Sequence, residues 1–179
     1  MTTYTEDLTK VQKFYLNNTD EIRSMFKGEF YNIEFDNDLL SKLFDQWSNI
    51  DFITTSDSQL YGISARVNFW RNTKRCVTIR YTRSNGTPTE YQKALDVYDN
   101  KVKCDPIISS FHIQIDSDDE MKIERAIIVN KRQLIEHIRD NIDGLQPYIE
   151  TAKDGNTYIK LPYEYVVESK INYKIHDFA

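Results

Sequence analysis

Alternating apolar and polar residues near the middle of the chain predict two neighbouring strands. Residues 51–55 and 60–69 are rich in Ile, Val, Thr and aromatic residues, and Ser56-Asp57-Ser58 between them is typical of a turn. Successive strand side chains point to opposite faces of a sheet. If the strands pair as a hairpin, Asp51 lies near the polar face of the second strand. That face holds Leu60, Gly62, Ser64 and Arg66, and the core-facing side holds Tyr61, Ile63, Ala65 and Val67.

Helical spacing and turn signals divide the rest of the chain. Helices are predicted at 5–17, from Thr19 or Asp20 to Lys27, from Asp36 or Asn37 to about Trp47, from a Thr87 cap onward, and at 130–142. Strands are predicted at 75–83, 107–115 and 123–129, with a hairpin formed by 148–151 and 157–161. This order favours an α+β (or α/β) fold with one mixed sheet flanked by helices. We expect a single domain over residues 1–179, with a helical part at 1–48 and a sheet-containing core at 49–179.

The bulk composition limits the class of protein. The length of 179 residues suits one domain, and no apolar run approaches the roughly 20 residues that a membrane span needs. The first residues lack the pattern of a signal peptide. Cys76 and Cys104 form no metal motif and no disulfide framework. We therefore expect a cytoplasmic protein whose thiols are reduced and free.

Charge is distributed unevenly along the chain. The net charge is −5, yet the segment from Arg66 to Arg83 contains six cations and no acid, which leaves −11 for the remainder. Such a band predicts a local anion-binding face, with Trp70 available to stack on bases. The alternative is a set of solvated cations along strand edges. The six cations are Arg66, Arg71, Lys74, Arg75, Arg80 and Arg83.

Several catalytic motifs do not occur in the sequence. It contains no Gly-x-Ser-x-Gly turn and no glycine-rich phosphate loop, and His112, His137 and His176 lack the spacing of metal ligands. We expect these histidines to be structural or on the surface. The remaining candidate constellation is Asp51 with the polar face of the strand that follows it.

Two short segments resemble the PD-(D/E)xK nuclease superfamily, which has the restriction-endonuclease-like fold. They are Asn49-Ile50-Asp51-Phe52-Ile53 and Tyr61-Gly62-Ile63-Ser64-Ala65-Arg66-Val67. The resemblance implies an αβββαβ core over roughly residues 36–129, in which the strand at 75–83 and the helix after it take part. It also implies that Asp51 binds a divalent metal, with Mg²⁺ suited to oxygen ligands, and that Ser64 and Arg66 occupy the other catalytic positions.

The sequence departs from that family at two of the three positions. Ser64 stands where the family has Glu, Asp or Gln, and Arg66 stands where Lys is usual. Arginine stays protonated and cannot act as a base, although it can clamp a phosphate through two N–H groups. A second carboxylate has to come from elsewhere, and the candidates are Asp45, Glu21 and Glu90. The structural alternative is that Asp51 caps a turn and Arg66 is an ordinary strand cation.

These observations predict a protein that handles nucleic acid, with DNA preferred to RNA. It would be either a metal-dependent phosphodiesterase, which if active is an Mg²⁺-dependent endonuclease, or a catalytically degenerate DNA-binding derivative. The alternative is an acidic protein-interaction module, for example a phage or mobile-element protein that occupies a basic, nucleic-acid-binding partner in the host cytoplasm.

Overall fold

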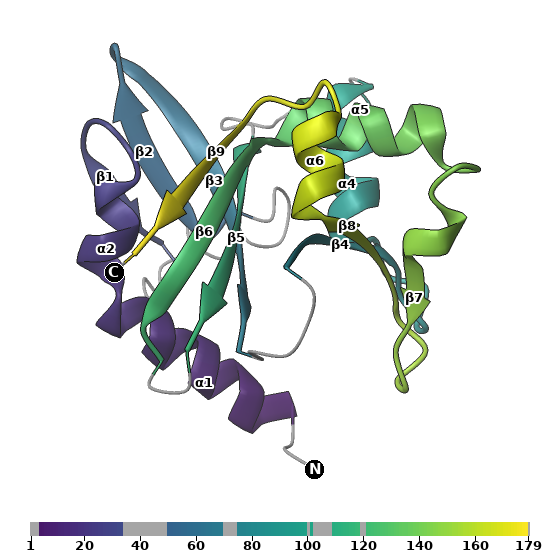
Figure 1. Cartoon of the computed structure of the whole chain (residues 1–179), viewed down its shortest axis with the longest axis horizontal. Helices are drawn as coiled ribbons and strands as arrows, with labels where there is room; N and C mark the ends of the chain where they lie inside the picture. The colour runs from purple at the N-terminus through teal and green to yellow at the C-terminus, as the bar shows by residue number, and fades with distance from the viewer. Residues whose placement is uncertain are drawn as a thin grey trace.

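Two β-sheets flanked by helices make up an α+β fold in the computed structural model (Figure 1). The structure describes residues 4–33, 50–69, 75–99, 101, 109–118 and 121–178. The larger, six-stranded sheet has the order β1 (Phe30–Asn32), β2 (Phe52–Ser56), β3 (Gln59–Asn68), β5 (Ser109–Ser117), β6 (Ile123–Asn130) and β9 (Tyr173–Asp177). The smaller, three-stranded sheet has the order β4 (Cys76–Thr82), β8 (Thr157–Pro162) and β7 (Ile149–Thr151).

Helices cover both faces of the larger sheet. Helices α1 (Tyr4–Asn17) and α2 (Thr19–Ser24) lie on one side, and α4 (Glu90–Tyr98), α5 (Lys131–Asn141) and α6 (Tyr163–Glu168) pack with the smaller sheet (Figure 1). A 3₁₀ turn, Gln146–Tyr148, leads into β7. None of the helices in the described ranges is long and apolar enough to cross a membrane.

The predicted hairpin between residues 51 and 69 is confirmed. Strands β2 and β3 pair antiparallel, with Phe52 opposite Ile63. The turn residues Asp57 and Ser58 have φ angles of 51° and 62°, which is the conformation of a tight hairpin turn whose twist matches the flanking strands. Ile63 is fully buried against α1 and α2, so the assignment of the apolar face is also confirmed.

The pairing of β3 with β5 is parallel and therefore needs a crossover, in which α4 lies. Thr89 caps α4: its Oγ1 accepts a hydrogen bond from Gln92 N, and Gln92 Oε1 accepts one from Thr89 N. The prediction of a Thr87 cap was thus wrong by two residues. The actual cap makes Glu90 the first residue of the helix and turns it toward the interior, where it is 2% exposed.

The prediction of one mixed sheet was wrong for residues 75–83. Strand β4 leaves β3 and pairs with β8, so that Thr78 lies opposite Lys160. The apolar face of β4 packs with α4, α5 and α6, and its polar face holds Cys76, Thr78 and Arg80. Alternation in the sequence assigned these faces correctly, but it carries no information on which strand is the partner.

The other predicted elements mostly agree with the structure, with shifted ends. The helix at 5–17, the strand at 123–129, the helix at 130–142 and the hairpin at 148–161 are confirmed, and the second helix ends at Ser24 rather than Lys27. Strands β1 and β9 and helix α6 were not predicted. The predicted helix at 36–47 lies outside the described residues, as do Asp45, Trp70, Arg71, Lys74 and Cys104. Cys76 is described, and it is a free thiol as expected.

Two apolar clusters enclose the larger sheet and leave a polar interior between them. Ile113 and Ile115 of β5 pack with α1 and α2, whereas Ile127 and Val129 of β6 pack with α4 and α5. Along β3 and β5, the residues that point away from α1 and α2 are Ser64, Arg66, His112 and Gln114. The fold therefore places these polar side chains inside the molecule.

Candidate functional site

Five side chains from four elements form a buried polar cluster. Its members are Ser64 and Arg66 of β3, Glu90 of α4, His112 of β5 and Lys131 of α5. Glu90, His112 and Lys131 have side chains at most 1% exposed, whereas the side chain of Arg66 is 23% exposed. The polar cluster is thus sealed from solvent except at Arg66.

Glu90 lies at the centre of the polar cluster. Its Oε2 accepts hydrogen bonds from Nη2 and Nε of Arg66 at 2.7 and 3.2 Å. Its Oε1 lies 3.5 Å from Lys131 Nζ and 3.3 Å from His112 Nδ1, contacts between charges or dipoles rather than well-aligned hydrogen bonds. Burial raises the pKa of Glu90, but Arg66 and Lys131 outweigh this effect and hold the pKa well below its usual range. Glu90 is therefore an anion that compensates two cations.

The two cations of the polar cluster respond differently to burial. Burial lowers the pKa of Arg66, but the negative charge of Glu90 outweighs it and raises the pKa above its ordinary value. Burial also lowers the pKa of Lys131, and there the attraction of Glu90 and Asp51 offsets it only in part. The guanidinium is thus the firmly charged member of the pair.

Asp51 borders the polar cluster from the start of β2. Its N–H donates to Ile63 O at 2.8 Å, and its Oδ2 accepts from Ala65 N at 2.5 Å. Its charge also acts on both Arg66 and Lys131. The structure thus brings together Asp51, Ser64 and Arg66, the three residues that the family resemblance selected, and joins Asp51 to the backbone of β3.

His112 does not have the connections of a catalytic triad. A triad histidine contacts the nucleophile through one ring nitrogen and the acid through the other. Here Ser64 Oγ, at 3.1 Å, and Glu90 Oε1, at 3.3 Å, both face Nδ1, while Nε2 is buried with no hydrogen-bond partner among the described residues. The ring is fully buried. His112 is thus buried rather than on the surface, and its structural role stays a prediction.

The environment of His112 predicts a pH dependence of stability. Burial lowers the pKa of His112, so the folded protein prefers the neutral ring. Its contribution to stability is present above the unfolded pKa of about 6.5 and is lost as the pH falls toward the folded pKa. We expect His112→Asn to flatten the decline in unfolding free energy between about pH 7.5 and pH 5.5, by at most about 1.4 kcal/mol per pH unit.

Urea unfolding at a series of pH values measures this slope. His137→Gln is the comparison variant, because burial also lowers the pKa of the half-buried His137, which contacts the Tyr165 hydroxyl; it gives the share of the slope that a second histidine contributes. A His112→Asn variant that keeps the wild-type slope would show that His112 is not the titrating group.

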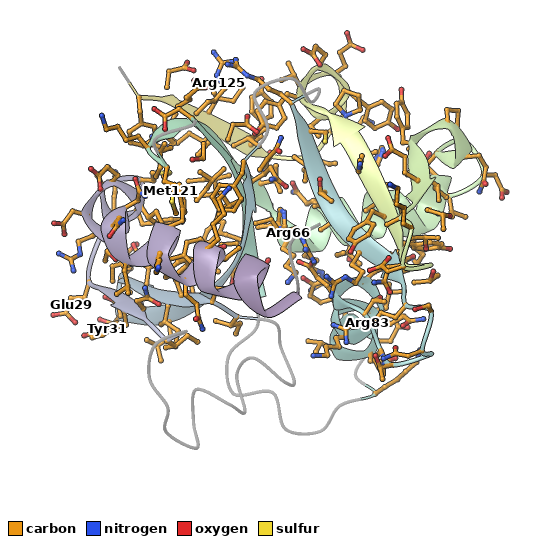
Figure 2. The ribbon with its side chains drawn as sticks, turned by 90° about the horizontal axis from the view of Figure 1, so that it is seen from below. Glu29, Tyr31, Arg66, Arg83, Met121 and Arg125 are labelled. Carbon is orange, nitrogen blue, oxygen red and sulfur yellow. The ribbon has the colours of Figure 1, made fainter. Side chains whose placement is uncertain are left out.

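A groove of about 480 Å³ opens where Arg66 leaves the polar cluster. It lies between β3 and β5 of the larger sheet and β4 and β8 of the smaller sheet, with α1 along one side, and Figure 2 shows Arg66 between the two sheets. Arg66 and Lys160 line it, and none of the described lining residues is an acid. The lining residues are Val11, Tyr15, Ala65, Arg66, Val67, Asn68, Cys76, Thr78, Gln114 and Lys160.

A third cation, Arg80, shares the strand face that borders the groove. Arg80 alternates with Thr78 on β4, and its guanidinium lies 5.5 Å from the centre of the Tyr158 ring. Its Nε is buried and has no hydrogen-bond partner in the described part of the chain. Lys160 is 39% exposed and pairs with Glu150 at 2.5 Å. The polar faces of the two sheets thus bring Arg66, Arg80 and Lys160 to one region.

Of the remaining cations of the predicted basic band, the structure describes Arg75 and Arg83, and neither lines the groove. Arg75 Nε lies 4.0 Å from Asp116 Oδ2, and Arg83 Nη1 donates to Thr87 Oγ1. Figure 2 shows Arg83 well apart from Arg66. Arg71, Lys74 and Trp70 lie outside the described residues.

Sequence reasoning missed Lys131 and Lys160 but named Glu90 among three candidate acids. A signal for Lys131 was present: it occupies the same helical stripe as Leu134, Ile135 and Ile138, all of which are buried. Lys160 could not be found in this way, because its position depends on the pairing of β8 with β4.

The carboxylates near Arg66 are a poor set for magnesium. Mg²⁺ favours oxygen ligands in octahedral geometry. Both oxygens of Glu90 already face cations or His112, and Asp51 Oδ2 accepts a backbone N–H. Among the described residues, no three His, Cys, Asp or Glu side chains form a group that could hold a metal ion. We derive no step through a metal, and Mg²⁺ binding at Asp51 stays a prediction.

Comparisons with known proteins give no match to this chain: no family model, no curated protein and no solved structure is detectably similar to it.

Proposed function

We propose that this protein binds nucleic acid and that the groove beside Arg66 receives the phosphate backbone. The observation that carries this proposal is that Arg66 and Lys160 line one groove and that none of its described lining residues is an acid, in a protein of net charge −5. Glu90 and Glu150, which pair with these two cations, are not among those lining residues. Positive side chains that neutralise phosphates supply most of the sequence-independent affinity for nucleic acid. Arg80, whose buried Nε lacks a partner in the described residues, adds a third donor nearby.

Glu90 prepares Arg66 for this role. Because Nε and Nη2 both donate to Glu90, the guanidinium plane is held in one orientation, and Nη1 is available to a phosphate oxygen. A fixed guanidinium loses little entropy on binding and presents a directed donor to phosphate. Lysine at this position would supply charge without that geometry.

The order of elements supports a nuclease-like origin for the groove. Strands β1, β2 and β3 are antiparallel neighbours, and α4 then leads to β5, which is parallel to β3. Together with α2 this resembles the αβββαβ order of the PD-(D/E)xK core. Asp51 opens the second of these strands, and Ser64 and Arg66 lie on the third. In this interpretation β1 belongs to the αβββαβ core. Strand β4, which the family resemblance placed in that core, instead pairs with β8 in the smaller sheet.

A metal-dependent phosphodiesterase is the second candidate. The observation that favours it is the convergence of Asp51, Glu90 and Lys131, two carboxylates and a lysine, which are the residue types that the family resemblance implies. In this alternative, Glu90 and Lys131 would stand in for the acid and the lysine that are missing at positions 64 and 66. Both side chains are at most 1% exposed, so a metal would have to displace the contacts that Glu90 makes with Arg66 and Lys131.

Fluorescence anisotropy with labelled single-stranded DNA, duplex DNA and RNA, in the absence of Mg²⁺, tests the binding proposal. We expect affinity to fall steeply with salt. Lys160→Gln should weaken binding about three- to tenfold and reduce the slope of log K against log salt by about one. Lys153→Gln is the matched control, because Lys153 is exposed and does not line the groove.

Three experimental outcomes distinguish nucleic-acid binding in the groove from the phosphodiesterase alternative. An affinity that does not respond to salt, or an equal effect of Lys160→Gln and Lys153→Gln, would contradict binding in the groove. Mg²⁺-dependent cleavage that disappears in Asp51→Ala would establish the phosphodiesterase instead.

A further inference from the structure

A second hollow, of about 460 Å³, lies at the opposite end of β3 from the groove and on the α2 side of the larger sheet. We call it the aromatic pocket. The segment after α2 and parts of β2, β3, β5, β6 and β9 line it. Its volume falls within the 300–1,000 Å³ typical of small-molecule sites. The residues that matter most are Phe26, Tyr61, Phe111, Tyr173, Lys27 and Lys174.

Three half-buried rings form a continuous wall of this pocket. The ring centre of Phe111 lies 6.2 Å from that of Phe26 and 5.9 Å from that of Tyr61, with both pairs tilted. Tyr173, on β9, is 42% exposed and adds a fourth ring at the rim. Planar ligands gain affinity from such rings by stacking, whatever their hydrogen-bonding groups.

The same pocket carries uncompensated positive charge. Lys27 and Lys174 are both exposed, and neither pairs with an acid among the described residues. In the described part of the chain, no acidic residue lines the pocket. Glu29, two residues after Lys27, accepts a hydrogen bond from the Tyr31 hydroxyl. In a protein of net charge −5, two lysines beside a ring wall favour an anionic ligand.

Amide side chains add donors and acceptors at the edge of the pocket. Asn130 uses its Oδ1 to cap α5, which leaves its Nδ2 as a donor, and the exposed Asn172 also lines the pocket. Amides of this kind hydrogen-bond the edges of nucleobases. The pocket thus combines ring faces, edge-reading amides and cations.

We propose that the aromatic pocket binds a mononucleotide, with the base against Phe111 and its neighbouring rings and the phosphate near Lys27 and Lys174. A purely apolar ligand would make no ionic contact with the two lysines, and a simple inorganic anion would not stack on the rings. This site is separate from the groove, since the two share no lining residue. It therefore does not depend on the function proposed for Arg66.

Calorimetric titration with AMP, adenosine and inorganic phosphate tests the proposal. We expect saturable one-to-one binding of AMP that is tighter than binding of either part. The double variant Lys27→Gln/Lys174→Gln should weaken AMP at least about tenfold and leave adenosine nearly unchanged. Tyr61→Leu should weaken both ligands. The matched control is Lys153→Gln/Lys170→Gln, which removes two exposed lysines outside the pocket.

The absence of saturable AMP binding would overturn the proposal, as would an equal loss in the control double variant. A free mononucleotide and a nucleotide unit of a strand share this chemistry, and competition distinguishes them. Displacement of AMP by an oligodeoxyadenylate that still binds to Lys160→Gln identifies a unit of a strand as the ligand. Simultaneous binding of both identifies the free nucleotide.

Discussion

Glu90→Gln is expected to lower the free energy of unfolding by about 3–5 kcal/mol, the range measured when one partner of a buried ion pair is removed. The substitution keeps the shape of the side chain but removes the anion that faces both Arg66 and Lys131. Lys131 is 1% exposed and burial already lowers its pKa, so removing the Glu90 charge takes away attraction that offsets the burial of the ammonium. The loss therefore comes from weaker compensation of buried charge rather than from a cavity. Urea unfolding at pH 7.5 measures it.

Glu136→Gln is the matched control. Glu136 pairs with Arg132 on the exposed face of α5, and such surface pairs contribute about 0.2–1 kcal/mol. A second variant separates charge from shape: Glu90→Gln combined with Lys131→Met removes one of the two cations that lose the attraction of Glu90, and it should recover part of the loss. An unfolding midpoint for Glu90→Gln within the error of Glu136→Gln would show that the polar cluster does not depend on this carboxylate.

Gly28→Ala is expected to destabilise the protein by about 3 kcal/mol or more, through two additive effects. The φ angle of Gly28 is +93°, and a side chain in the left-handed region costs about 1–2 kcal/mol. A Cβ there would also lie 1.7 Å from the carbonyl oxygen of Thr55, in the backbone of β2. Overpacking of this kind typically costs a further 1–3 kcal/mol. The chain around Gly28 cannot easily move away, because Glu29 and Thr55 are joined by hydrogen bonds.

Gly86→Ala isolates the conformational part of this effect. Gly86 also has a positive φ, +73°, but a Cβ there would meet no atom within 4 Å. We expect only the conformational cost of about 1–2 kcal/mol. Thermal unfolding of both variants gives the comparison, and equal shifts in Tm would mean that β2 does not approach Gly28 as closely as described.

Local patterns predicted local structure well. Alternation along residues 60–67 separated Ile63, which is buried with α1 and α2, from Ser64 and Arg66, which face the polar cluster. The Asn130 cap of α5 was also correct, and its Oδ1 accepts from Gln133 N. Strand β1 has only three residues, too few to show a period. A long alternating segment or a complete capping motif was therefore enough to predict an element, and a three-residue strand was not.

Tertiary pairing could not be predicted in the same way. Alternation determines which face of β4 is polar, but its pairing with β8 joins residues about 80 positions apart. Glu90 was one of three candidate acids, and the choice depended on where the crossover places the start of α4. Lys131 was overlooked because lysine is almost never fully buried without a partner, and its partner, Glu90, lies on another helix.

The interleaving of the two sheets bears on how the chain acquires its fold. Strand β4 pairs with β8, and β6 pairs with β9, and both partners come late in the chain. Neither sheet is therefore complete until residues 157–177 have been synthesised. Contacts of such long sequence separation slow folding, because loop-closure entropy is lost before the contacts form. A nascent chain that reaches only β6 exposes the apolar side of β4 and an open backbone edge, the kind of surface that chaperones bind and that aggregates when left uncovered.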